Sequence, residues 1–247
     1  MQANSLQGRS ALVTGSVQGI GLAIAKALAS AGARIAVHGL AHAQQIEAAL
    51  SAVRSAGAPE AKFFDGDMRD PNKIDALMHA VAAWGGADIL VNNAGVQHTV
   101  SMAELTTEIW DKVISINLSA AAHTMRHALP AMAKRGYGRV INISSVHGLV
   151  ASIHKAPYVA SKFGLIGLSR VAALEYAHVG SRATGGVTIN CICPGWTETP
   201  LIEPQILARA GEFGGDRTAP IAGRDNTPRQ PHQRCHSRGD VARRESA

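Results

Sequence analysis

The sequence predicts an α/β fold in which a doubly wound parallel sheet carries helices on both faces. Two observations lead to this fold class. Short apolar segments alternate with segments of helical periodicity along residues 10–191, an order typical of parallel sheets. In addition, 46% of the 247 residues are hydrophobic and 17% are charged. A chain of that length and composition can bury a sizeable core, so a wholly disordered chain is excluded.

The predicted elements follow from the spacing of apolar residues. Short apolar segments are predicted as strands at residues 10–14, 34–38, 61–65, 89–92, 139–143 and 187–191. Segments with apolar residues at helical spacing are predicted as helices at residues 20–31, 44–55, 71–84, 108–135 and 158–177. We expect Gly32 to end the first helix, because glycine tolerates the left-handed conformation common just past a helix.

The composition changes after about Ala210. Beyond that point large apolar residues are sparse, and arginine and proline recur without helical or strand periodicity. We therefore expect residues 1–210 to form a single dinucleotide-binding and catalytic domain, for the reasons given below, and residues 211–247 to be a disordered tail. The tail resembles a GC-rich gene read out of frame, and resequencing the gene in the original frame tests this hypothesis.

Cysteine content and hydropathy exclude several classes of protein. The three cysteines are too few for a disulfide scaffold and suit a reducing compartment, so we expect a cytoplasmic protein. No apolar run reaches the roughly 18 residues of a transmembrane helix, and residues 1–10 lack the pattern of a secretory signal. We therefore expect no membrane partner.

Neither the net charge nor the cysteine and histidine residues point to a partner. The formal charge of +6 and the pI near 9.5 would suit nucleic acid. The charges are scattered or lie in the arginine-rich tail, however, without a basic stripe interleaved with aromatic residues. We predict no nucleic-acid binding. No metal site is predicted either, because Cys191 and Cys193 lack a second pair at zinc spacing, and His232, Cys235 and His236 lie in the tail.

Residues 14–21 (T-G-S-V-Q-G-I-G) join the first predicted strand to the first helix. Gly15, Gly19 and Gly21 leave backbone N–H groups at the helix N-terminus open to an anion, and the helix dipole favours negative charge there. This arrangement is typical of the pyrophosphate-binding turn in a Rossmann-like fold. The spacing is G-x-x-x-G-x-G rather than G-x-G-x-x-G, and a plain tight turn would also use glycine.

The residues after the second and third strands bear on the choice of nucleotide. Residues 38–40 (H-G-L) contain neither the acid that would bind the ribose of NAD nor the arginine that would suit the 2′-phosphate of NADP. Gln18 stands in the phosphate loop in place of a basic residue, so the sequence favours NAD. Asp67 could meet the adenine amino group, or it could be an N-terminal acid of the helix at Pro71. Both interpretations stay open.

Small residues follow the fourth predicted strand. The motif N-N-A-G at residues 92–95 could let a cofactor approach the backbone closely. A plain turn would have the same composition, so this motif alone does not decide between the two.

Ser145, Tyr158 and Lys162 form the strongest candidate for a catalytic group. Tyr158 and Lys162 are four residues apart on a predicted helix and share one face. A cation one turn away would favour the phenolate and lower the pKa of the tyrosine, which is ordinarily near 10. Tyrosine then becomes a plausible general acid/base for an alcohol/ketone pair. Ser145 ends the fifth strand, and the carboxyl ends of parallel strands are where ligands bind in such sheets.

These motifs, in their order along residues 8–210, resemble the short-chain dehydrogenases/reductases. The resemblance implies a catalytic tetrad of Asn117, Ser145, Tyr158 and Lys162. In it, Tyr158 is the acid/base, Lys162 lowers its pKa and holds the nicotinamide ribose, Ser145 orients the substrate oxygen, and Asn117 holds a relay water. The implied cofactor residues are Gly15, Gln18, Gly19, Ile20, Gly21, Asp67, Asn93, Gly95, Tyr158, Lys162 and Thr199.

A narrower resemblance is to the soluble D-3-hydroxybutyrate dehydrogenases. It rests on residues 95–98 (G-V-Q-H), 145–150 (S-V-H-G-L-V), 155–158 (K-A-P-Y) and 193–201. It implies NAD as cofactor, a small hydroxy acid as substrate and a homotetramer. A carboxylate substrate needs charge-assisted hydrogen-bond donors near the catalytic tyrosine. The implied substrate residues are Gln97, Ser145, His147, Lys155, Tyr158, Trp196 and Gln205.

Two alternatives stay open. One is another reductase of this fold, such as an NADP-dependent 3-oxoacyl reductase. The other is a nucleotide-binding pseudoenzyme with a defective C-terminal part, because the helix, last strand and V-D-G-G turn that end this family are not found in residues 211–247. We therefore expect the last strand of the sheet to be missing. Residues 179–186 also resemble a short surface insertion.

Overall fold

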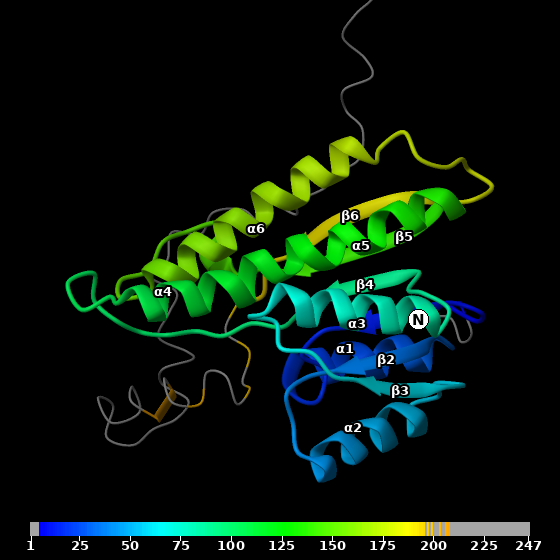
Figure 1. Cartoon of the computed structure of the whole chain (residues 1–247), viewed down its shortest axis with the longest axis horizontal. Helices are drawn as coiled ribbons and strands as arrows, with labels where there is room; N and C mark the ends of the chain where they lie inside the picture. The colour runs from blue at the N-terminus through cyan, green and yellow to red at the C-terminus, as the bar shows by residue number, and fades with distance from the viewer. Residues whose placement is uncertain (1–4, 196, 198, 200–202, 204–205, 208–247) are drawn as a thin grey trace, which may run out of the picture.

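A six-stranded sheet forms the centre of the computed structural model, which describes residues 5–195, 197, 199, 203, 206 and 207 (Figure 1). Every strand pairing is parallel, and the order across the sheet is β3-β2-β1-β4-β5-β6. The strands are β1 (Ser10–Val13), β2 (Arg34–His38), β3 (Ala61–Phe64), β4 (Ile89–Asn92), β5 (Tyr137–Ile143) and β6 (Gly186–Ile192). The strand order reverses between β1 and β4, which confirms the predicted doubly wound sheet.

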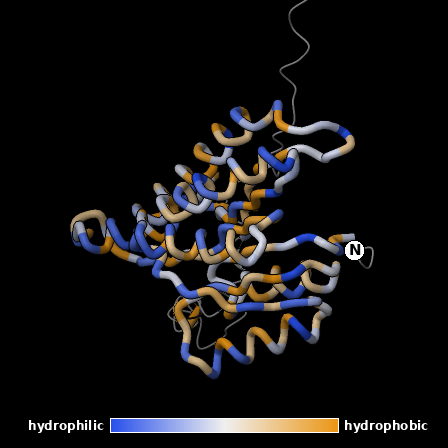
Figure 2. The backbone as a smooth tube through the Cα atoms, turned by 45° about the vertical axis from the view of Figure 1, so that its right-hand side comes forward, coloured by the Kyte–Doolittle hydropathy of each residue, from blue (hydrophilic) through white to orange (hydrophobic). Residues whose placement is uncertain are grey.

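Helices cover both faces of this sheet. They are α1 (Gly19–Ser30), α2 (Ala43–Ser55), α3 (Pro71–Ala83), α4 (Thr107–Ile114), α5 (Ala120–Arg135) and α6 (Ala156–Glu175). Helices α1 and α2 pack on one face, while α3, α5 and α6 pack on the other. Figure 2 shows hydrophobic and hydrophilic residues alternating along these helices, as expected for elements with one buried side.

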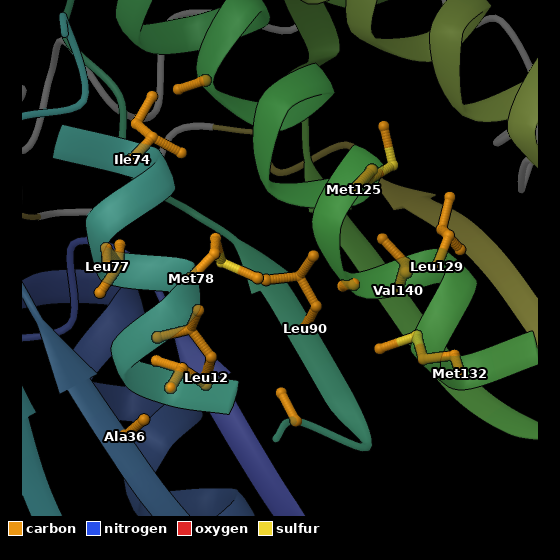
Figure 3. Packing of buried hydrophobic residues seen from close by; sticks show 14 of the residues in the cluster. Leu12, Ala36, Ile74, Leu77, Met78, Leu90, Met125, Leu129, Met132 and Val140 are labelled. Carbon is orange, nitrogen blue, oxygen red and sulfur yellow. The ribbon is translucent and has the colours of Figure 1, made fainter. Parts of the chain in front are cut away.

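Alternate residues of each central strand contribute to two separate cores. On the α3–α5 side, Leu12, Leu90 and Val140 pack against residues of both helices, including Met78 and Met132 (Figure 3). Neighbouring residues of the same strands point to the α1–α2 side. Every residue of β1 and β4 is buried. A strand buried on both faces needs a nearly continuous apolar run, and this is why sequence alone located these strands.

The helical tract predicted over residues 108–135 is continuous but not uniform. Between α4 and α5 lies a π-helical turn, Ser115–Ser119. Such turns insert one extra residue per turn and often occur at functional sites. The turn contains Asn117, which is buried. Neither the turn nor its effect on Asn117 was predicted from the sequence.

Two predictions concern the C-terminal end of the described chain. Among the described residues, β6 pairs only with β5 and is therefore an edge strand. The predicted tail at residues 211–247 lies outside the described residues.

Within the described part of the chain, no helix is both long and apolar enough to cross a membrane.

Candidate active site

A cavity of about 630 Å³ lies at the carboxyl ends of the strands, where the order of the sheet reverses. The loops that follow β1, β2, β3, β4 and β5 all contribute to its walls. All the predicted cofactor residues line it: Gly15, Gln18, Gly19, Ile20, Gly21, Asp67, Asn93, Gly95, Tyr158, Lys162 and Thr199. Ser145 also lines the cavity, so the predicted nucleotide and catalytic residues share one space.

The phosphate loop packs too closely against its neighbours to admit side chains at two of its glycines. Gly15 has a φ of +63°, and a Cβ there would lie 3.0 Å from the Cα of Ala94. A Cβ on Gly21 would lie 2.3 Å from the Gly15 carbonyl oxygen. The first intrahelical bond of α1 runs from the Leu22 N–H to the Gln18 carbonyl. The N–H groups of the first helical turn therefore precede the helix ladder and can bind an anion.

Asn93 clamps the end of β4 to the phosphate loop. Its side-chain Nδ2 donates to the carbonyl oxygens of Thr14 at 2.9 Å and Gly15 at 3.0 Å, and its backbone N–H donates to the Thr14 hydroxyl. The family resemblance implies that Asn93 is a cofactor residue. The structure shows that both donors of its amide are engaged in shaping the loop.

Asp67 lines the cavity from the loop that follows β3. Its carboxylate accepts hydrogen bonds from the Arg69 side chain, with Nε 2.9 Å from Oδ2. This hydrogen bonding holds the pKa of Asp67 below its usual value and raises the pKa of Arg69. The helix at Pro71 has no acidic residue in its first turn, and Asp70, not Asp67, caps it by accepting from the Asn72 N–H at 2.8 Å.

Arg69 is a cavity residue that the sequence analysis missed. It lines the cavity beside residues 38–40, where the ribose end of a dinucleotide is expected in this fold. The only sequence signal was a basic residue two positions after Asp67. Because Arg69 pairs with Asp67, its charge is already partly neutralised within the chain.

Ser145, Tyr158 and Lys162 converge as predicted from their spacing. Ser145 follows β5, and the other two lie one turn apart on α6. The Ser145 hydroxyl hydrogen-bonds the Tyr158 side chain. Lys162 Nζ donates to the Ile143 carbonyl at 2.8 Å and lies 5.6 Å from the centre of the Tyr158 ring.

The pKa of Tyr158 differs from the sequence-based expectation. It is raised rather than lowered, because burial penalises the phenolate more than the Ser145 hydrogen bond favours it. Burial also lowers the pKa of Lys162 to about 8. The expected lowering of the tyrosine pKa by Lys162 therefore does not prevail in this structure, since both groups are buried and each charged form is destabilised.

Asn117 contacts the loop that follows β4, close to this catalytic group. Its Oδ1 accepts from the Val96 N–H at 2.8 Å, and its Nδ2 donates to the Val96 carbonyl at 2.9 Å and the Ser161 hydroxyl at 3.2 Å. A Cβ placed on Gly95 would lie 3.4 Å from Asn117 Oδ1 and 3.7 Å from Lys162 Nζ. The π-helical turn thus brings Asn117 to the same backbone segment as Lys162. Asn117 is not among the residues that line the cavity.

Three of the predicted substrate residues, His147, Lys155 and Gln97, are not among the residues that line this cavity. The His147 ring meets the Tyr158 ring edge-on, with 6.3 Å between ring centres. Lys155 caps the N-terminus of α6 and is only 6% exposed. Gln97 follows Val96, and its buried Nε2 has no hydrogen-bond partner among the described residues. Such an unsatisfied donor is costly unless a ligand completes it.

The remaining predicted site residues lie near the C-terminal end of the described chain. Thr199 lies over the phosphate loop, because a Cβ on Gly19 would be 3.7 Å from its side chain. Trp196 and Gln205 lie outside the described residues. Within the described ranges, no group of three or more His, Cys, Asp and Glu side chains could hold a metal ion. His232, Cys235 and His236 also lie outside those ranges.

Comparisons with known proteins agree with this geometry. The family model described as short chain dehydrogenase matches residues 9–209. The chain is 48% identical to "D-beta-hydroxybutyrate dehydrogenase" of Cupriavidus necator over 85% of this chain and 78% of that protein. It is 47% identical to the protein of the same name from Rhizobium meliloti, over 83% and 78% of the two chains.

A solved structure extends the comparison to three dimensions. The 3-oxoacyl (acyl-carrier-protein) reductase of Agrobacterium tumefaciens, with NADP bound, is 31% identical and superposes with a TM-score of 0.76. The match covers 85% of this chain and 78% of that one. The sheet order, the cavity at its reversal point and the family match together show that the chain belongs to the short-chain dehydrogenase family of oxidoreductases.

Proposed function

We propose that this oxidoreductase converts D-3-hydroxybutyrate to acetoacetate with NAD. The observation that carries the proposal is a set of three polar side chains at or near the catalytic elements. The His147 ring meets the Tyr158 ring, Lys155 is buried at the start of the same helix, and Gln97 has a buried, unsatisfied Nε2. The identity of 48% and 47% to two D-beta-hydroxybutyrate dehydrogenases supports it.

A carboxylate is the substrate group that best suits these three side chains. Lys155 lies three residues before Tyr158 and is buried, and an ammonium group can form a charge-assisted hydrogen bond to a carboxylate. Gln97 offers a buried amide donor that the described residues leave unsatisfied. Charge-assisted hydrogen bonds from such donors would hold a small hydroxy acid with its hydroxyl directed at Tyr158. A thioester offers no carboxylate to such donors.

The cavity fits a nicotinamide dinucleotide. The glycines of the phosphate loop form a surface that a single Cβ would block, and the first turn of α1 presents N–H groups to a pyrophosphate. When bound, the dinucleotide supplies the hydride acceptor. We propose that Gly19, Ile20 and Gly21 hold its phosphates, while Lys162 holds the nicotinamide ribose.

The chain's own residues then move the proton. Ser145 would donate a hydrogen bond to the substrate oxygen. Tyr158 would first release its own proton towards the Lys162 amine and then, as the phenolate, accept the proton of the substrate hydroxyl. Lys162 has a pKa of about 8, so it can exist as an ammonium or an amine near neutral pH and can pass the proton on. Asn117 positions Val96, which precedes the donor Gln97.

The first test is absorbance at the NADH band with the purified full chain. We expect NAD to be reduced with D-3-hydroxybutyrate. We expect much slower reduction when the L-enantiomer replaces the substrate or when NADP replaces NAD. Faster turnover of a 3-oxoacyl thioester with NADPH would contradict the proposal and favour the reductase alternative. Nucleotide binding without turnover of any hydroxy acid would identify a pseudoenzyme. The homotetramer and the cytoplasmic location stay predictions, which size measurement and cell fractionation would test.

The Asp67–Arg69 pair leads to a prediction about cofactor choice. Replacing Asp67 with Asn removes the carboxylate that neutralises Arg69, so the arginine becomes available to a 2′-phosphate. We expect the ratio of kcat/KM for NADP to that for NAD to rise by about tenfold. The control is Glu47→Gln, which breaks a comparable exposed pair with Arg54 on α2, away from the cavity. An unchanged ratio in Asp67→Asn would show that this pair does not influence the choice.

A further inference from the structure

We propose that His38 is a positioning residue of the nucleotide site, whose neutral ring ties the phosphate loop to the loop after β3, and whose protonation weakens nucleotide binding. The proposal rests on the proposed function, since it takes the cavity to be a dinucleotide site. His38 is a buried titratable group to which the catalytic proposal gives no role. It ends β2 and is 2% exposed.

The two ring nitrogens of His38 bridge two loops that are distant in sequence. The Gly15 N–H donates to Nδ1 at 3.2 Å, and Nε2 lies 2.8 Å from the Gly66 carbonyl oxygen. Gly15 belongs to the phosphate loop, and Gly66 immediately precedes Asp67. Both loops line the cavity, so the ring helps to set the spacing between its phosphate and adenosine ends.

These two partners define the protonation state of the ring. A backbone N–H can only donate, so Nδ1 must accept and cannot carry a proton. A carbonyl can only accept, so Nε2 must carry the proton. The bridge therefore requires the neutral ring. In the doubly protonated ring, an N–H at Nδ1 would face the N–H of Gly15, and that contact would become repulsive.

The same contacts remove His38 from direct recognition of the ribose. In dinucleotide folds an acidic side chain at this position hydrogen-bonds the ribose hydroxyls. Both nitrogens of His38 are engaged with protein backbone instead. A second tie fixes the strand end, because the Ser16 N–H donates to the His38 carbonyl at 2.7 Å, and the His38 N–H donates to the Ser16 hydroxyl at 3.1 Å.

Burial and the polar groups around His38 shift its pKa in opposite directions. Asp65 and the hydrogen bond to Gly66 favour the charged ring, and the Asp67–Arg69 pair lies in the same loop. The phosphate loop, residues 14–21, contains no charged side chain. Burial outweighs these two interactions and lowers the pKa of His38 below its usual value. A histidine with a lowered folded-state pKa supports the fold fully above about pH 6.5, and that support is lost as the pH falls through the folded-state pKa.

The test measures NADH affinity by fluorescence from about pH 8 down to the lowest pH at which circular dichroism shows the chain still folded, without substrate. The wild-type chain is expected to lose affinity by about tenfold as the pH falls, since one hydrogen bond is replaced by a repulsive contact. His38→Asn keeps an acceptor at the δ position for the Gly15 N–H but cannot ionise. We expect its affinity to stay within about threefold of the wild-type value at high pH and to be nearly independent of pH.

Further variants and outcomes separate positioning from a general structural role. His38→Leu removes both contacts and should bind NADH weakly at every pH. His178→Asn, at an exposed histidine beyond α6, should keep the wild-type pH profile. A flat wild-type profile, tighter binding at low pH, or an unchanged profile in His38→Asn would overturn the role of His38 alone. Absence of NADH binding at every pH in the wild-type chain would instead overturn the proposed function and this inference together.

Discussion

Replacing Tyr158 with Phe is expected to lower kcat for oxidation of D-3-hydroxybutyrate by roughly a hundredfold to ten-thousandfold, the range of general acid–base catalysis. The substitution removes the hydroxyl that would take the substrate proton and keeps the ring, which packs near His147 and Lys162. Because the ring stays in place, NADH affinity should change by less than about threefold. Steady-state kinetics and NADH fluorescence titration measure the two quantities separately.

Tyr176→Phe is the matched control. Tyr176 follows the end of α6 and packs partly buried against the core, away from the cavity. Its loss of a hydroxyl should leave kcat and NADH affinity near the wild-type values. A loss of less than about tenfold in Tyr158→Phe would assign the acid–base role to another group. A parallel loss of NADH affinity would indicate that the hydroxyl shapes the cavity rather than transfers a proton.

Replacing Gly21 with Ala is expected to destabilise the fold by about 3 kcal/mol and to abolish tight nucleotide binding. The new Cβ would lie 2.3 Å from the Gly15 carbonyl oxygen and 2.5 Å from Asn93 Nδ2. To relieve these contacts, α1 must move away from the phosphate loop. The movement would break the hydrogen bonds from Asn93 to the Thr14 and Gly15 carbonyls. It would also displace the N–H groups proposed to hold the phosphates.

Urea denaturation and NADH titration test this expectation. Gly167→Ala is the control, since Gly167 lies exposed on α6 and a Cβ there meets nothing within 4 Å. That change should leave nucleotide binding intact and stabilise the chain by up to about 1 kcal/mol, because alanine favours helix more than glycine does. If Gly21→Ala unfolds at the wild-type denaturant concentration and still binds NADH, the close packing at this turn is unimportant.

The sequence by itself was sufficient for the sheet and for most of its helices. Residues 34–38 and 89–92 were predicted as strands and coincide with β2 and β4. They were recognisable because a parallel strand buried on both faces needs a continuous apolar run, a pattern that depends on neighbouring residues alone. The convergence of Tyr158 with Lys162 was equally accessible, since a spacing of four residues places them on one helix face.

Only the tertiary structure decided how the site works. It placed Asn117 in a π-helical turn, put Arg69 on the cavity wall, and made His38 a bridge between Gly15 and Gly66. It also reversed the expected shift in the pKa of Tyr158. These properties depend on burial and on contacts between segments far apart in the chain. Residue spacing and apolar periodicity report neither burial nor long-range contacts. The motifs therefore identified many of the site residues, but not the direction in which their pKa values shift.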